Sequence, residues 1–317
     1  MSERAPADPS TAVRSLFFGS GRFAVPILDA LVAIPQVSVV AVVSAPDRPV
    51  GRKAAITPTP VTARARELGL PVLQPARVRT AESVEALGAL SPELAVLADY
   101  GQLIPRSLLD LPPRGFLNLH PSALPRWRGA APVPATILAG DRDSAVSLIC
   151  LVEEMDAGPL VAVEPLAVRP DDTAATLEDR AAEAAARLLA RALPEWLAGR
   201  LSARPQTADG VTVTRPLRRE DGRLDPARSA AELERQVRAY QPWPGSYLET
   251  PEGRLIVWRA SVAPSLPGDV AGRLIADSSG LALATSSARL ALEEVQLSGG
   301  RRMSAGELLR GRPKLLR

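Results

Sequence analysis

Cysteine and histidine are almost absent from the 317-residue sequence, each occurring once, as Cys150 and His120. A single cysteine excludes an internal disulfide framework and any metal site with several thiolate ligands, and it suits a reducing compartment. A single histidine excludes a zinc site with several imidazole ligands. Any imidazole-dependent chemistry must therefore use His120, whereas Cys150 lies in an apolar stretch and is expected in the core.

Lysine and long apolar runs are also scarce. Of the 38 basic residues only Lys53 and Lys314 are lysines. The longest uncharged stretch, residues 30–46, is too short to span a membrane and contains Pro35 and Gln36. The polar N-terminal stretch has no apolar core of a signal peptide. These absences predict a soluble cytoplasmic protein with no membrane partner.

Charge is nearly balanced but unevenly placed. The formal net charge is +3. Residues 201–317 hold 18 basic and 13 acidic side chains, whereas residues 1–200 hold 20 and 22. A basic C-terminal third could meet a polyanion such as nucleic acid. An arginine-rich genome composition would produce the same bias, so charge alone leaves both readings open.

Strand-like and helix-like segments alternate from about residue 14 to residue 199. Alternation of this kind predicts an α/β fold, a Rossmann-like, doubly wound and mainly parallel sheet. A proline-rich loop over residues 46–60 interrupts it. The expected strands are 16–18, 37–43, 71–73, 94–98, 116–119 and 145–152, and the expected helices are 23–33, 61–68, 81–90 and 173–197.

The pattern changes after residue 199. Capping boxes at Ser229 and Ser304 each predict the start of a helix. With five short strand candidates (246–249, 255–260, 272–275, 281–284 and 288–297), they suit a small OB-like β-barrel. The predicted organisation is a polar tail (1–13), a catalytic domain (14–199), a linker (200–214) and the C-terminal domain (215–317). Trp243, between two prolines, is expected to pack in the barrel.

A glycine-rich turn follows the first predicted strand. Residues 19–24 fit the pattern GxGxxA, which can bind the pyrophosphate of a dinucleotide. The acidic residue that should follow is represented only by Asp47, inside a proline turn. A nicotinamide-dependent oxidoreductase is therefore a weak alternative, testable by the absorbance of bound nicotinamide.

A denser group of polar residues follows the strand at 116–119. Asn118 and His120 are two positions apart, so they project from the same face near the carboxyl end of the strand, where open α/β sheets bind ligands. An amide donor beside an imidazole can stabilise an oxygen that gains negative charge during acyl transfer. Asp156, on a turn after a later strand, is expected to approach His120 across the top of the sheet and orient its ring. These three residues are the predicted catalytic group.

The residues that carry this chemistry resemble those of the tetrahydrofolate-dependent formyltransferases. Asn118–His120 followed by Ser122–Pro125 resembles that family's N-x-H…S-L-L-P stretch, and Met155–Gly158 resembles its L-D-x-G turn. The resemblance implies 10-formyltetrahydrofolate as formyl donor, no metal, Asn118 and His120 on the reacting oxygen, and Asp156 paired with His120. It also implies a folate site formed by Ser122, Ala123, Leu124, Pro125, Tyr100 and Gly101.

Further motifs resemble the members of that family that formylate methionine on initiator tRNA in translation initiation. They are residues 17–26, 46–52, 57–61, 126–132, 220–225 and 242–245. The resemblance implies initiator methionyl-tRNA and folate as partners, and a monomer. The implied tRNA-binding residues are Arg48, Arg52, Lys53, Arg215, Arg218, Arg219 and Arg223.

Several positions depart from the family pattern. The loop has Ala54 and Ala55 where relatives commonly carry lysines, Asp99 adds a charge, and Gly21 replaces a polar residue. Ala123 and Pro121 also differ from the usual residues. Two alternatives stay open: a formyltransferase for a nucleotide sugar or another small amine, and a catalytically inactive RNA-binding protein on the same scaffold.

Overall fold

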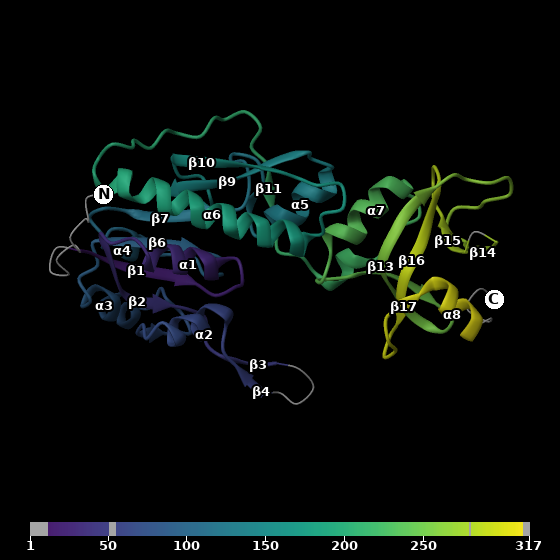
Figure 1. The fold of residues 1–317 in the computed structure, drawn as a ribbon, viewed down its shortest axis with the longest axis horizontal. Helices are drawn as coiled ribbons and strands as arrows, with labels where there is room; N and C mark the ends of the chain where they lie inside the picture. Colours follow the sequence, from purple (N-terminus) through teal and green to yellow (C-terminus); the bar gives the residue numbers. More distant parts are fainter. Residues whose placement is uncertain (1–11, 51–54, 279, 313–317) are drawn as a thin grey trace, which may run out of the picture. The chain divides into compact units, whose positions relative to one another are not determined.

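The computed structural model describes residues 12–50, 55–278 and 280–312 of the chain (Figure 1). By its internal contacts the chain divides into two units, each with its own hydrophobic core. The N-terminal unit comprises residues 1–129, 143–167 and 178–213, and the C-terminal unit comprises residues 130–142, 168–177 and 214–317.

A seven-stranded sheet with the order β10-β9-β7-β6-β1-β2-β5 forms the centre of the N-terminal unit. Neighbouring strands from β7 to β5 are parallel, whereas β9 is antiparallel to β7 and β10 to β9. The strands are β1 (Val13–Gly19), β2 (Val37–Val43), β5 (Val72–Leu73), β6 (Leu94–Ala98), β7 (Phe116–His120), β9 (Asp143–Cys150) and β10 (Leu160–Ala167). This sheet confirms the predicted mainly parallel α/β fold.

Helices cover both faces of this sheet, as double winding requires. On one face α1, α2 and α6 pack through residues such as Leu28, Val61 and Leu188. On the other face α3 and α4 contribute Leu87 and Leu108. The helices are α1 (Ala24–Val32), α2 (Pro60–Glu67), α3 (Ala81–Gly88), α4 (Arg106–Leu109) and α6 (Ala174–Leu197). Alternate residues of a buried strand therefore belong to different cores.

The C-terminal unit is built on a six-stranded sheet whose strand pairs are all antiparallel. Its order is β12-β13-β16-β15-β14, with β17 paired to β16. Helices α7 and α8 pack on its apolar face through Leu233 and Leu308. Both begin at the predicted capping boxes, Ser229 with Glu232 and Ser304 with Glu307. The strands are β12 (Ser246–Thr250), β13 (Gly253–Ala263), β14 (Leu274–Asp277), β15 (Gly280–Ala284), β16 (Arg289–Leu297) and β17 (Met303–Ser304), and the helices are α7 (Ala230–Ala239) and α8 (Ala305–Gly311).

Some elements were not expected from the sequence. The loop at 46–60 contains a short hairpin of β3 (Arg48–Val50) and β4 (Ala55–Thr57), which projects beside α2 in Figure 1. Helix α5 (Pro132–Ala139) starts with a proline in its first turn, where no intrahelical N–H is needed. Short pieces complete the chain: β8 (Arg128–Gly129), β11 (Val213–Thr214) and a 3₁₀ turn (Arg219–Gly222).

Among the residues that the structure describes, no helix is long and apolar enough to cross a membrane.

Candidate active site

Strand β7 carries the first two residues of the site. Its five residues are all buried. Leu117 and Leu119 point into the core under α1 and α6, so Asn118 and His120 face the opposite side of the sheet. Each of the two polar residues is only 5 % exposed. Two polar side chains withdrawn from water in this way require hydrogen-bond partners.

Asp156 supplies those partners from the loop between β9 and β10. One carboxylate oxygen, Oδ1, accepts a hydrogen bond from Asn118 Nδ2 at 3.2 Å. The other, Oδ2, accepts the backbone N–H of Gly129 at 2.8 Å and lies 3.5 Å from His120 Nδ1. Asp156 is 8 % exposed and has a positive φ of 52°. The structure therefore brings together the three predicted catalytic residues.

The direction of β9 sets the route by which Asp156 reaches the other two residues. Strand β9 is antiparallel to β7, with Leu117 opposite Cys150. The loop after β9 therefore starts beside the amino end of β7, and Asp156 reaches back to Asn118 and His120 along that strand. The antiparallel direction of β9, which sets this route, was not predicted from the sequence.

Both ring nitrogens of His120 face hydrogen-bond acceptors. Nε2 lies 2.9 Å from the carbonyl oxygen of Trp127, and Nδ1 faces Asp156. A neutral imidazole has one N–H and can donate to only one of the two, whereas a protonated ring can donate to both. Trp127 has a φ of 61° and its ring is covered by the Arg126 guanidinium at 4.4 Å. The His120 ring thus lies between a carboxylate and a backbone carbonyl.

The chemistry of this group suits an acyl or formyl oxygen. Asn118 uses one of its two amide protons on Asp156, which leaves the second for a substrate oxygen. Donors fixed in a buried site stabilise developing negative charge without reorganisation. In the described part of the chain, no three His, Cys, Asp or Glu side chains gather as a metal site.

The residues expected at the folate site have different roles in the fold. Ser122 is fully buried and donates to the carbonyl of Arg126, so it braces the loop after β7. Leu124 is buried, and Ala123 and Pro125 are half-buried on the same loop. Gly101 is exposed with a φ of 80°.

Tyr100 is the one predicted folate residue with an unsatisfied polar group. Its ring is 3 % exposed and packs edge-on against Phe18, with ring centroids 5.4 Å apart. Its buried hydroxyl has no hydrogen-bond partner within the described residues, and burial raises its pKa to about 12. A polar atom of a bound molecule would satisfy this hydroxyl, so the observation fits a ligand near the loop after β6.

The predicted tRNA-binding arginines fall into three groups. Arg52 and Lys53 lie outside the described residues, and Arg48 is exposed on β3. Arg215 is held by Asp221, with two N–O distances of 2.8 and 2.6 Å. Arg215 is exposed as well, and so are the remaining three: Arg218, Arg219 and Arg223.

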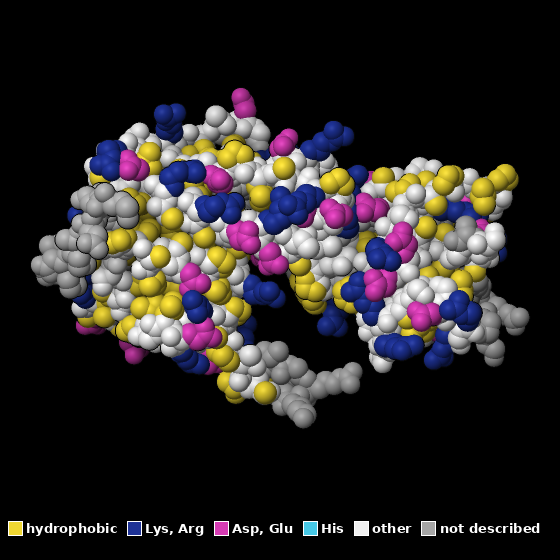
Figure 2. Space-filling view, in the orientation of Figure 1, with side chains coloured by type: hydrophobic (Ala, Val, Ile, Leu, Met, Phe, Trp, Pro, Cys, Tyr) yellow, Lys and Arg dark blue, Asp and Glu magenta, His cyan; other side chains and the backbone are white. Residues whose placement is uncertain are grey.

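The surface carries both signs of charge. On the face shown in Figure 2, basic and acidic side chains are interspersed on both units. Trp243 is 52 % exposed, so the prediction that it packs in the barrel is wrong. An exposed indole is suited to stacking on a nucleobase.

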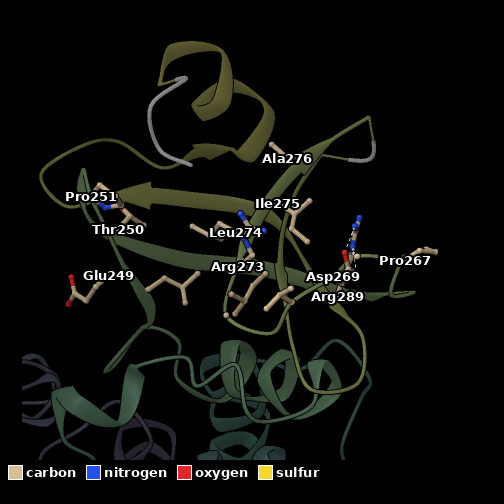
Figure 3. Close-up of a pocket in the computed structure, with 15 residues that line it drawn as sticks. Glu249, Thr250, Pro251, Pro267, Asp269, Arg273, Leu274, Ile275, Ala276 and Arg289 are labelled. Atoms are coloured by element: carbon tan, nitrogen blue, oxygen red, sulfur yellow. Dashed lines mark hydrogen bonds and ion pairs between the residues drawn. The ribbon is translucent and has the colours of Figure 1, made fainter. Parts of the chain in front are cut away.

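A pocket of about 650 Å³ lies in the C-terminal unit (Figure 3). Its lining includes Leu248 of β12 and Leu274 and Ile275 of β14, the two edge strands of the sheet. Arg289 at its rim is bonded to Asp269 and Asp277 at 2.6 Å each. None of the predicted catalytic residues lines this pocket.

Comparison with known proteins identifies relatives over nearly the whole chain. The model of the formyl transferase family matches residues 13–193, and the model of its C-terminal domain matches residues 216–313. A methionyl-tRNA formyltransferase of Halorhodospira halophila is 43 % identical over 302 residues, covering 95 % of this chain and 97 % of the relative. One from Thermus thermophilus is 45 % identical over 304 residues, covering 94 % and 96 %.

Solved structures share the fold at lower identity. HypX from Aquifex aeolicus in complex with tetrahydrofolic acid aligns with a TM-score of 0.61 at 18 % identity, covering 95 % of this chain and 47 % of HypX. An N-formyltransferase from Helicobacter canadensis, in complex with folinic acid and dTDP-3-aminofucose, aligns with a TM-score of 0.65 at 14 % identity, covering 88 % and 99 %.

Proposed function

The chain belongs to the formyl transferase family in both of its domains, and we propose that Asn118, His120 and Asp156 carry the transfer. The enzyme moves a formyl group to the α-amine of methionine esterified to initiator tRNA, the reaction after which its 41–45 % identical relatives are named. The observation that carries the assignment of residues is the Asp156 carboxylate, which binds Asn118 and faces His120 within one buried site.

The donor is 10-formyltetrahydrofolate, which supplies an activated formyl carbon to the amine. Four residues of the loop after β7 (Ser122–Pro125), together with Tyr100 and Gly101, would line its site. The unsatisfied Tyr100 hydroxyl supports a polar ring system near this loop. Because the reaction belongs to translation initiation, we place it in the cytoplasm, and a monomer remains our expectation.

Asn118 directs its second amide proton at the formyl oxygen as that oxygen gains negative charge. His120 Nε2, which lies 2.9 Å from the Trp127 carbonyl, is the ring atom that donates to the reacting oxygen. Asp156 keeps the imidazole oriented through Nδ1. Together with His120 it can take the proton that the attacking amine releases and return it to the leaving nitrogen.

Acceptor RNA is bound by the basic C-terminal unit and the hairpin of β3 and β4. Exposed arginines there contact phosphates and set affinity without reading sequence. The supporting observation is the exposure of Arg48, Arg218 and Arg219.

The test is formyl transfer from 10-formyltetrahydrofolate to charged initiator tRNA, with wild type and His120→Ala compared. Wild-type transfer that collapses in the variant supports both reaction and residue. Transfer to an amino-sugar nucleotide in place of the tRNA would contradict the acceptor. Transfer that survives in His120→Ala would overturn the proposed role of the histidine.

A further inference from the structure

Gln206 contacts the Asp156 loop, although it lies fifty residues further along the chain, in the segment after α6. Its side-chain Nε2 donates to the backbone carbonyls of Asp156 at 2.7 Å and Gly158 at 2.8 Å. Its Oε1 accepts from Arg128 Nε at 3.1 Å and Nη2 at 2.8 Å. A single side chain therefore joins the loop after β7 to the loop after β9.

The orientation of this amide is fixed by its partners. Two carbonyl oxygens require the NH₂ end, and two guanidinium N–H groups require the oxygen end. Rotation of the amide by half a turn would oppose donors to donors and acceptors to acceptors. Gln206 thus makes all four hydrogen bonds that its amide can form, and two of them involve a charged group.

These bonds act where the Asp156 loop is strained. Asp156 has a φ of 52°, an arrangement that a residue with a side chain adopts only when its surroundings impose it. Gln206 holds the carbonyl of Asp156 itself, and Gly129 holds its carboxylate from the other side at 2.8 Å. Because Arg128 and Gly129 are consecutive, the two contacts close a ring around Asp156.

The same segment holds the loop after β7 at a second point. Thr212 Oγ1 accepts the backbone N–H of Trp127 at 2.8 Å, and the Thr212 carbonyl accepts that of Arg128 at 2.9 Å. The carbonyl that faces His120 belongs to Trp127. Both groups that face the ring nitrogens of His120 are therefore tied to residues 206–212.

We propose that Gln206 is a positioning residue for formyl transfer, which fixes the Asp156 turn so that its carboxylate meets Asn118 and His120. The inference rests on the proposed function, since it concerns the same three catalytic residues. Gln206 acts through Asp156 and need not touch either substrate. A displacement of a catalytic group by about 1 Å can lower a rate about 100-fold.

The test compares Gln206→Met and Gln206→Glu with wild type. Methionine keeps most of the volume but loses all four hydrogen bonds, whereas glutamate keeps the acceptors for Arg128 and loses the donors to the two carbonyls. Thr207→Ala is the matched control, because Thr207 is exposed on the same segment and its hydroxyl donates to the carbonyl of Asp209, away from the Asp156 loop. Two quantities are measured: steady-state kinetics with both substrates, and the ring ¹H and ¹⁵N resonances of His120 at one pH.

The expected result is a kcat lowered at least 10-fold in both Gln206 variants, with KM for each substrate within about threefold of wild type. Because His120 is the only histidine, its ring signals are identified without assignment, and they should move in both variants. Thr207→Ala should match wild type in both measurements.

Each contrary outcome is decisive. A kcat within twofold of wild type, or unchanged His120 resonances, would overturn the proposal. If neither Gln206 variant folds, the proposal is also overturned, because Gln206 would then be needed for folding and not specifically for positioning Asp156. If wild type does not formylate the tRNA, the proposed function fails, while the His120 resonances still decide whether Gln206 positions the site.

Discussion

The carboxylate of Asp99 occupies the space that Gly21 leaves by lacking a side chain. A Cβ built on Gly21 would lie 1.6 Å from Asp99 Oδ2 and 2.8 Å from its Cγ. The backbone carbonyl of Asp99 also accepts the N–H of Ser20 at 2.9 Å. The turns after β1 and β6 are thus fitted to each other, and the two departures from the family pattern lie in contact in this chain. This fit, not a pyrophosphate, accounts for the second glycine of the GxGxxA pattern, so nothing remains to favour an oxidoreductase.

The fit predicts coupling between the two positions. Gly21→Ala should destabilise the wild-type protein, because Asp99 must rotate away, and should cost less in an Asp99→Ala background. We expect a coupling free energy of about 1 kcal/mol from urea unfolding of the four proteins in the cycle. If the free-energy changes of the two substitutions add within about 0.3 kcal/mol, the two positions are not coupled and the prediction is wrong.

Asp99 also predicts a pH dependence of stability. Burial of its carboxyl raises its pKa to about 6, and the carboxylate of Glu178 lies close enough to interact with it. A folded-state pKa above the unfolded value means that the folded protein binds the proton more tightly, so this group opposes folding as pH rises through about 6. Asp99→Asn should therefore stabilise the protein at pH 8 by roughly 1 kcal/mol, after discounting for the exposed part of the residue, and by much less at pH 4. Thermal unfolding at the two pH values measures this, and an equal gain at both would refute it.

Asp156→Asn should lower kcat roughly 100- to 1,000-fold. The amide keeps the volume but removes the charge, and its NH₂ group would oppose the N–H of either Asn118 or Gly129. Steady-state kinetics are compared with Glu153→Gln, which neutralises an exposed carboxylate on the same loop. Equal losses of kcat in both variants would show that the net charge of the loop matters, and not the contacts of the Asp156 carboxylate with Asn118 and His120.

Gly222→Ala should destabilise the C-terminal unit. A Cβ there would lie 2.0 Å from the carbonyl oxygen of Gly245, a backbone atom that cannot rotate away. We expect a loss of about 1–3 kcal/mol and weaker tRNA binding, with the His120 resonances unchanged. Gly311→Ala is the control, because among the described residues no atom outside its own helix backbone and chain neighbours lies within 4 Å of its Cβ position. A stable Gly222→Ala protein would contradict the close approach.

Two arginines of the C-terminal unit should respond differently to salt. Arg219 is exposed, and its replacement by alanine should lower the slope of log K for tRNA against log salt by about 1. Arg215 hydrogen-bonds Asp221 and lowers the pKa of that carboxyl to about 2, so Arg215→Ala should change the slope less. Binding titrations at several salt concentrations compare the two, and equal slopes would contradict the distinction.

The sequence predicted the buried elements well and the surface elements poorly. Strands β2 and β6 were predicted with their observed bounds, because runs of β-branched and apolar residues leave few alternatives for a central parallel strand. Strand β10 was missed, since Glu164 and Pro165 interrupt its pattern. Both residues are tolerated there because β10 is the edge of the sheet.

The catalytic group was also predicted only in part. Asn118 and His120 could be paired from their spacing alone, since a strand places them on one face. The partners that orient them could not be found in that way. Gly129 and Trp127 act through backbone atoms, and Gln206 lies in a polar segment without periodicity whose place depends on tertiary contacts.

The contacts of Gln206 and Thr212 also bear on exchanging domains between relatives. The matched family domains end at residue 193 and resume at residue 216, so a hybrid enzyme would naturally be joined in the stretch between them. In a hybrid joined before Gln206, the catalytic domain would come from one protein and the segment that contacts its active-site loops from another. Hybrids that change the second domain to alter RNA preference should therefore retain this chain through Thr212. Hybrids joined before residue 206 and hybrids joined after residue 212 should both fold, but they should differ in turnover.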